Sequence, residues 1–252
     1  TSENIASLAS TTDAMTRSAS YKDTGVVDTK IMSNTYYVGE KGDEIADYSY
    51  NYKLGTTNLI KSTSKFYYGA AEAIASLAST TDAMTKSSSY KDTGVVADKI
   101  MSNTYYWGEK GDEIADYSYN YKLGTTNLIK STSKFYYGVA ENIASLASTT
   151  DAMTKSSSYK DEGLIATKIM SDTYYWGEKG DEIADYSYNY KLGTTNLIKS
   201  TSKFYYGTSE KIASEASTTD AMTKSSSYKD TGIVADKIMS NTYYWGEKGD
   251  EI

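Results

Sequence analysis

The chain repeats itself every 69 residues, and this periodicity limits what it can fold into more than any other feature. The same phrase begins at Ile5, Ile74, Ile143 and Ile212. Residues 1–69, 70–138 and 139–207 form three nearly identical copies, and residues 208–252 form a partial fourth. Self-similarity at such a period is typical of repeat architectures, in which neighbouring units bury surfaces that a single unit cannot bury alone. The sequence therefore predicts a tandem array.

The copies differ at few positions, and the substitutions are mild. They include Val38 for Trp107, Arg17 for Lys86, Asp172 for Asn103, and Glu215 for Leu146. A catalytic site needs several different groups in one asymmetric arrangement, whereas a uniform array presents any site several times. We therefore expect a structural or binding repeat protein and not an enzyme.

Two absences from the composition exclude common site chemistries. The 252 residues contain no Cys and no His. Without Cys there are no disulfides, thiolate metal sites or cysteine nucleophiles. Without His the chain lacks the commonest general base and transition-metal ligand. We expect no catalytic residues and no cofactor.

Charge and hydropathy bear on the partners of the chain. The formal net charge is −7, and Arg17 is the only arginine. Nucleic-acid binding needs a clustered basic face, which this composition does not favour. No apolar run approaches the roughly 18–20 residues of a membrane span. We expect neither nucleic acid nor a membrane span, and we expect the chain's main partner to be itself.

The pattern within each copy favours β-strands. In the segment 116–123, Tyr117, Tyr119, Tyr121 and Leu123 alternate with polar residues. This period of two is typical of a strand with one half-buried face, and a second alternating segment covers 130–135. Turns are expected at 92–94, 108–112 and 124–127, where Gly, Asp and Asn gather. The sequence predicts an all-β repeat array, either a β-meander or a β-solenoid-like fold, with about five strands per copy.

A helical interpretation competes with this one. Ile143, Leu146, Thr150 and Met153 follow the spacing of a helix face. Short helices of this kind would build an α-solenoid. The abundance of Ser, Thr, Tyr, Asn and Gly opposes helices, because each costs roughly 0.5–1 kcal/mol relative to Ala in a helix interior.

Aromatic side chains are the main candidates for binding. The chain holds 27 Tyr residues, which could pack from strand to strand or could present rings to a ligand. The Trp positions favour exposure, because the first copy replaces Trp with Val38. The candidate binding residues are Tyr105, Tyr106, Trp107, Tyr174, Tyr175, Trp176, Tyr243, Tyr244 and Trp245.

An acidic turn is a weaker candidate for a metal site. Glu109, Asp112, Glu113 and Asp116 could supply oxygen ligands to Ca²⁺. The spacing matches no strict calcium motif, and Lys110 lies among the carboxylates. We therefore favour a solvated turn and expect no metal.

A short phrase resembles a known class of repeats. The segment from Tyr105 to Ile114 reads YYWGEKGDEI, and it resembles the aromatic hairpin repeats of bacterial cell-surface proteins, of the YD-repeat and cell-wall-binding-repeat type. The resemblance covers ten residues per copy and lacks the YD pair and the regular spacing of those repeats. It implies a location at the cell surface or outside the cell.

Two functions follow from these observations. The first is a structural repeat protein of a cell-surface or extracellular filament, possessing adhesive properties and self-associating head to tail. The given sequence begins and ends within a copy, which predicts an unpaired edge at each end of the sheet. The alternative is a multivalent module that binds carbohydrate or another surface protein with one aromatic site per copy.

Overall fold

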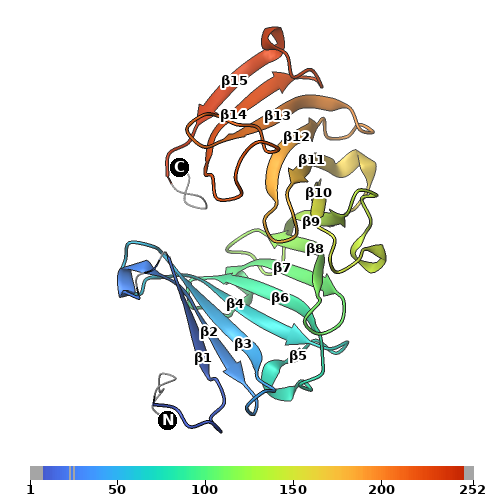
Figure 1. The fold of residues 1–252 in the computed structure, drawn as a ribbon. Coiled ribbons are helices and arrows are strands. Elements are labelled where there is room, and N and C mark those ends of the chain that lie inside the picture. Colours follow the sequence, from blue (N-terminus) through green and yellow to red (C-terminus); the bar gives the residue numbers. More distant parts are fainter. Residues whose placement is uncertain (1–7, 23, 25, 247–252) are drawn as a thin grey trace. The chain divides into compact units, whose positions relative to one another are not determined.

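The computed structural model describes residues 8–22, 24 and 26–246. The chain forms two compact units, Thr1–Ile129 and Lys130–Ile252 (Figure 1). In each unit the strands follow one another as antiparallel neighbours. This arrangement confirms the predicted all-β meander of repeats. The helical interpretation is wrong, because the described residues contain only short 3₁₀ turns besides the strands.

In the first unit the strands are β1 (Arg17–Tyr21), β2 (Ile31–Val38), β3 (Ile45–Tyr52), β4 (Ile60–Tyr68), β5 (Ala73–Ile74), β6 (Met84–Lys91), β7 (Ile100–Trp107) and β8 (Ile114–Tyr121). In the second they are β9 (Ile129–Tyr137), which begins at the boundary, β10 (Met153–Lys160), β11 (Ile169–Trp176), β12 (Ile183–Tyr190), β13 (Ile198–Tyr206), β14 (Met222–Lys229) and β15 (Ile238–Tyr243). The 3₁₀ helices are η1 (Asp28–Lys30), η2 (Ala75–Leu77), η3 (Ala97–Lys99), η4 (Ala144–Leu146), η5 (Ala166–Lys168) and η6 (Ala235–Lys237). A copy thus has four full strands, one fewer than predicted, and the two-residue β5 pairs only with β4.

Each unit shows the same division of side chains between its two faces. Tyr174 on β11 lies opposite Tyr186 on β12, and Tyr186 lies opposite Lys203 on β13. We call this side the Tyr–Lys face; in the second unit it also carries Lys155, Ser157, Tyr159, Asp172, Tyr188, Tyr190 and Thr201. The other side, the hydroxyl face, carries Ser156, Thr173, Ser187, Asn189 and Ser202. Because successive strand residues point to opposite faces, the alternation in the sequence produces this division directly.

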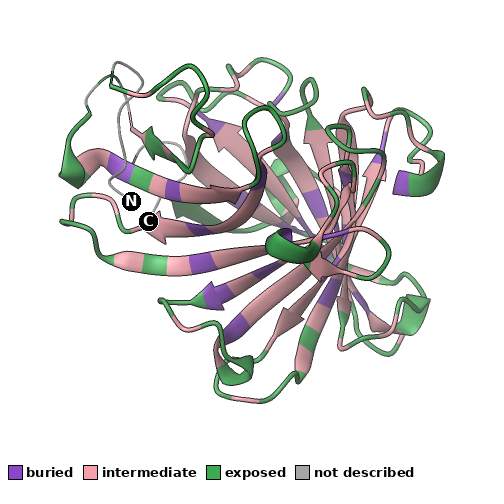
Figure 2. Cartoon of the chain, turned by 90° about the horizontal axis from the view of Figure 1, so that it is seen from below, coloured by how far each residue is buried: buried purple, intermediate pink, exposed green. Residues whose placement is uncertain are grey.

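The hydroxyl face is held by side-chain hydrogen bonds between strands. Thr173 Oγ1 donates to Ser187 Oγ at 3.1 Å, and Asn189 Nδ2 donates to Ser202 Oγ at 3.1 Å. The same bonds recur in the first unit, where Thr35 Oγ1 donates to Ser49 Oγ at 3.2 Å. Small hydroxyl side chains let strands pack closely while their polar atoms stay paired. Figure 2 shows buried residues as short bands along strands whose connecting turns are exposed.

One small apolar cluster lies at one end of the strands, while Ile31, Ile100 and Ile169 are buried at the other end. In the first unit it consists of Ile45, Tyr68 and Ala75, with Val38, Phe66, Ala78 and Met84 packed around them. Ile183, Tyr206 and Ala213 form the equivalent cluster in the second unit. The loop that contains η2 folds over the strands here, and the Tyr68 hydroxyl donates to the Ala46 carbonyl at 2.6 Å. Burial of this cluster fixes the loop on the sheet.

This loop is the segment for which the helical spacing was a false signal. Ile143 precedes η4, a single 3₁₀ turn, and Met153 begins β10. Its apolar residues recur because the loop packs on a sheet. Ala144 is fully buried, while Leu146 is 72 % exposed. The prediction for Leu123 was also wrong, since β8 ends at Tyr121 and Leu123 lies in the following turn.

Glycines and left-handed residues shape the turns that the sequence predicted. Gly108 has φ +133°, and a Cβ there would lie 2.6 Å from the Asp112 carbonyl oxygen. Only glycine fits this position without a shift of the backbone. Asn127 has φ 56° in the next turn, a conformation that Asn tolerates better than most residues. These turns set the length of every hairpin.

Carboxylates tie consecutive hairpins together. Glu113 Oε1 accepts a hydrogen bond from the Met84 amide at 2.8 Å, and its Oε2 accepts one from the Gly111 amide at 3.0 Å. Lys110 Nζ donates to the Thr80 carbonyl at 2.5 Å. The turn after β7 is thereby fastened to the loop before β6, about 30 residues earlier. Among the described residues, no helix has the length and apolar character required to cross a membrane.

Candidate ligand-binding cleft

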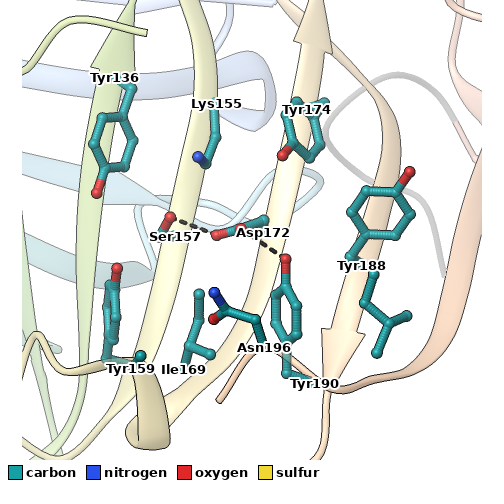
Figure 3. Close-up of a pocket in the computed structure, with 12 residues that line it drawn as sticks. Tyr136, Lys155, Ser157, Tyr159, Ile169, Asp172, Tyr174, Tyr188, Tyr190 and Asn196 are labelled. Atoms are coloured by element: carbon teal, nitrogen blue, oxygen red, sulfur yellow. Dashed lines mark hydrogen bonds between the residues drawn. The ribbon is translucent and has the colours of Figure 1, made fainter. Parts of the chain in front are cut away.

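A cavity of about 420 Å³ opens on the Tyr–Lys face of the second unit (Figure 3). It is lined by Tyr136, Lys155, Ser157, Tyr159, Ala166, Ile169, Asp172, Tyr174, Tyr188, Tyr190, Asn196 and Ile198. Its volume lies within the range of about 300–1,000 Å³ that is usual for small-molecule sites. We call this cavity the copy-3 cleft, since most of its residues belong to the third copy.

The strand register brings the lining side chains together. Ser157 on β10 lies opposite Asp172 on β11, and Asp172 lies opposite Tyr188 on β12. Alternate positions on each strand add further members of the same face. Asn196 enters from the turn between β12 and β13, where its φ of 55° is left-handed. Residues spread over more than sixty positions of the sequence therefore share one cleft.

Tyrosine rings form one wall. The Tyr174 ring stacks on the Tyr186 ring at 4.7 Å between centroids and meets the Tyr188 ring edge-on at 5.9 Å. Such arrangements are favourable for aromatic pairs, so each ring holds its neighbour in place. Burial raises the pKa of Tyr186 to about 12, and neighbouring tyrosines add to the effect. Tyr186 is therefore uncharged at neutral pH.

Lys155 supplies a positive charge at one end of the cleft. Its Nζ lies 2.7 Å from Glu141 Oε2 and 4.9 Å from the centroid of the Tyr136 ring. Burial alone would lower the pKa of Lys155, but the hydrogen bond to Glu141 and the nearby Asp172 carboxylate raise it overall. The ammonium group is thus charged, and Glu141 offsets its charge.

Asp172 lies at the centre of the cleft and is only 7 % exposed. Ser157 Oγ donates to its Oδ1, and the Tyr190 hydroxyl donates to its Oδ2 at 2.9 Å (Figure 3). Burial, followed by this hydrogen bond to a carboxylate, raises the pKa of Tyr190. A carboxylate has about four lone-pair positions, so two donors leave it with acceptor capacity toward the cleft.

The first unit carries an equivalent set of residues at the same register positions. Ser88 lies opposite Asn103 as Ser157 lies opposite Asp172. Of the twelve lining positions only this one differs between copies 2 and 3; the copy-2 residues are Tyr67, Lys86, Ser88, Tyr90, Ala97, Ile100, Asn103, Tyr105, Tyr119, Tyr121, Asn127 and Ile129. The ion pair is also kept, because Lys86 contacts Glu72.

The substitution reverses one hydrogen bond. In copy 2, Ser88 Oγ donates to Asn103 Oδ1 at 2.6 Å, and Asn103 Nδ2 donates to the Tyr121 hydroxyl at 3.0 Å. In copy 3 the tyrosine hydroxyl is instead the donor, and Asp172 is the acceptor. The amide can give a proton where the carboxylate can only receive one.

The predicted binding residues do not all lie on one face. Tyr105 and Tyr174 belong to the Tyr–Lys face, where Tyr174 lines the cleft. Tyr106 and Tyr175 lie on the hydroxyl face and share hydrogen bonds of 3.0 Å with Ser87 and Ser156. In the fourth copy Tyr243 is 59 % exposed, and the Tyr244 hydroxyl lies 3.1 Å from Ser225 Oγ. Trp107, Trp176 and Trp245 are 57 %, 58 % and 80 % exposed.

The acidic turn is built differently from a calcium site. Glu113 is engaged with two backbone amides, as described above. Two counterparts of Asp116, namely Asp47 and Asp185, form ion pairs with Lys65 and Lys203. Within the described ranges, no group of three or more Asp, Glu, His or Cys side chains is placed to hold a metal ion.

Sequence reasoning missed the centre of the cleft. Ser157, Asp172 and Tyr190 are separated by 15 and 18 positions, and only the strand register unites them. The one available signal was the change from Asn103 to Asp172, a charge introduced into an otherwise constant phrase. In comparisons with known proteins, the chain matches no family model, and no curated protein is significantly similar to it.

Proposed function

We propose that the protein is a multivalent carbohydrate-binding repeat protein in which each complete copy offers one tyrosine-lined cleft. The observation that supports this proposal is the cavity of about 420 Å³ with Tyr174, Tyr188 and Asp172 in its lining. A sugar ring has apolar faces of C–H groups and an edge of hydroxyl groups. Aromatic rings suit the faces, and Asp, Asn and Ser suit the hydroxyls.

Repetition supports the same proposal. Copies 2 and 3 carry the same lining residues at all positions but one. Several weak sites on one chain can bind a polymer of repeated sugars far more tightly than one site, since later contacts form at high effective concentration. A uniform array is well suited to a ligand that is itself repetitive.

The proposal is tested by equilibrium dialysis against labelled oligosaccharides of glucose, galactose, mannose and N-acetylglucosamine. The double variant Tyr119→Ala/Tyr188→Ala removes one ring from the copy-3 cleft and one from the equivalent residues of copy 2. We expect it to reduce the affinity of the bound sugar at least tenfold, because such rings supply most of the apolar contact area. The matched control is Tyr106→Ala/Tyr175→Ala on the hydroxyl face, which should bind as the parent does.

Binding by neither the parent nor the control to any of these sugars would refute the proposal. Equal loss in the cleft variant and the hydroxyl-face variant would point to an effect on the fold. Far-ultraviolet circular dichroism of both variants separates these cases.

A structural role in a filament is the second candidate. It is supported by hydrogen bonds that link hairpins and recur at intervals of one copy. The backbone amides of Met15, Met84 and Met153 donate hydrogen bonds to the carboxylates of Glu44, Glu113 and Glu182, respectively. Such bonds let an array grow by adding identical units. Sedimentation velocity at rising protein concentration tests it. Filaments would give species of increasing size, whereas a monodisperse chain would contradict self-association.

A further inference from the structure

We propose that the copy-3 cleft selects a ligand with a protonated amino group, such as an amino sugar, while the equivalent residues of copy 2 take an uncharged ligand. This inference deepens the proposed function and rests on it where the ligand is a sugar. Its basis is the exchange of Asn103 for Asp172 at the centre of two otherwise identical sets of lining residues.

The net charge of the lining residues differs by one unit between copies 2 and 3. In copy 2, Lys86 pairs with Glu72, and Asn103 adds no charge. In copy 3, Lys155 pairs with Glu141 in the same way, and Asp172 adds one negative charge. The lysine–glutamate pairs cancel in the comparison. The remaining carboxylate attracts a cation into the copy-3 cleft.

Burial makes this charge effective. Asp172 is only 7 % exposed, so water screens it weakly. Its two hydrogen-bond partners, Ser157 and Tyr190, are neutral hydroxyl groups that donate to it. The Lys155 ammonium group lies in the same cleft and is influenced by Asp172, but its ion pair is with Glu141. A buried charge with neutral partners gains more from an opposite charge than an exposed one does.

The surroundings of Asp172 also suit an ammonium group. The Tyr174, Tyr188 and Tyr190 rings line the same cavity, and a cation is attracted to the face of an aromatic ring within about 6 Å of its centroid. The protein already shows this contact, because Lys155 Nζ lies 4.9 Å from the Tyr136 ring. An amino group near Asp172 would therefore meet both a carboxylate and aromatic faces.

The direction of the hydrogen bonds also favours an ammonium ligand in copy 3. Tyr190 gives its hydroxyl proton to Asp172, so both groups present lone pairs to the cleft. An ammonium group carries only donors and matches this arrangement. In copy 2 this position is Asn103, which has no carboxylate to receive an ammonium group, and its amide donates to the Tyr121 hydroxyl.

The test uses equilibrium dialysis of the full chain with three labelled probes: glucosamine, glucose and ethanolamine. We expect the parent to prefer glucosamine over glucose by about tenfold or more at about one site per chain, since hydrogen bonds between an ammonium group and a carboxylate are stronger than those between neutral groups. Asp172→Asn should bring that preference close to one. This variant is conservative, because it gives copy 3 the residue that copy 2 already has.

The reverse variant is the matched partner. Asn103→Asp should raise the number of glucosamine-selective sites to about two per chain, because it places a carboxylate opposite Ser88, at the position that Asp172 occupies in copy 3. Copies 2 and 3 also differ nearby, since Leu164, Ile165 and Thr167 stand where copy 2 has Val95, Val96 and Asp98. Asn103→Asp tests the carboxylate alone, because the other residues of copy 2 stay unchanged. Circular dichroism of both variants tests whether they keep the fold.

The outcomes separate the inference from the proposed function. Binding of ethanolamine that Asp172→Asn abolishes, without binding of either sugar here or of the four oligosaccharides above, would sustain the amine inference and overturn the carbohydrate proposal. Binding of both sugars with the same preference in parent and Asp172→Asn would overturn the inference and leave the carbohydrate proposal standing. Absence of binding by all three probes overturns the inference; the carbohydrate proposal is overturned only if the four oligosaccharides of its own test also fail to bind.

Discussion

Single positions in the repeats act as natural substitutions within one molecule. The clearest case is the residue that lies opposite Asn103 in copy 2 and opposite Asn34 in copy 1. It is Ser88 in copy 2 but Ala19 in copy 1. Asn34 Nδ2 still donates to Tyr52 at 3.0 Å. Its Oδ1 is buried and, among the described residues, accepts no hydrogen bond. A buried acceptor without a donor costs roughly 1–3 kcal/mol.

We expect Ala19→Ser to stabilise the protein by about 1 kcal/mol, because the new hydroxyl would donate to Asn34 as Ser88 donates to Asn103. The measurement is the midpoint of urea unfolding. Ser88→Ala is the mirror-image variant and should destabilise by a similar amount. A stabilisation of zero for the first variant together with a clear loss for the second would show that β1 does not hold residue 19 in the register described.

Tyrosine ionisation gives a second prediction at this scale. Burial raises the pKa of Tyr68, Tyr105 and Tyr159 to about 12 from an ordinary value of 10. The folded state therefore keeps protons that the unfolded state releases, so this contribution to stability is complete below pH 10 and is lost as pH rises toward 12. We expect alkaline unfolding in that window, followed by tyrosinate absorbance and circular dichroism together.

Tyr105→Phe removes one of these ionisations and should move the alkaline midpoint to higher pH. An unchanged alkaline midpoint in Tyr105→Phe would contradict the raised pKa of this half-buried ring.

At the scale of elements, the sequence predicted the strands well and the loops poorly. The alternation of Tyr117 and Tyr119 with polar residues marks β8, because side-chain periodicity is a local property. The loop with η2 follows a helical spacing in the sequence, and only its packing on Ile45 and Tyr68 decides its conformation. The cleft could not be predicted, since it depends on which residue of β10 lies opposite which residue of β11.

Glu113 tests how such a loop is held. Glu113→Ala removes the acceptor for two backbone amides, and we expect it to expose the loop 70–83 to faster amide exchange and proteolysis. The loss of stability should be about 1–3 kcal/mol. Glu109→Ala, at an exposed position of the same turn, is the control and should leave the loop protected. Equal effects of both substitutions would assign the role to the net charge of the turn.

At the scale of the whole molecule, a copy is a unit of folding only together with its neighbours. The buried cluster of Ile45, Tyr68 and Ala75 is small, and most stabilising bonds run between adjacent strands. Stability in such arrays rises with the number of copies and then levels off. Deletion of one complete copy should therefore preserve the fold, whereas deletion of a different length should disrupt it.

We expect deletion of residues 70–138, one complete copy, to leave a folded protein with the same circular dichroism per residue and a lower unfolding midpoint. Deletion of residues 70–129 should unfold or aggregate the chain, since it joins strands out of register. A fragment of one copy should be largely unfolded. If both deletions fold equally well, the copies are not the structural units.

The order of the strands has a mechanical consequence. In each unit, strands that follow one another in the sequence are also hydrogen-bonded to each other. Tension along the chain would therefore act on an outer strand first and separate one strand pair at a time. Opening bonds in succession requires less force than shearing them together. Each copy of 69 residues would release roughly 230–250 Å of extended chain. The array would then behave as an extensible tether that lengthens in steps. The clefts of the copies that are still folded would keep their ligand bound.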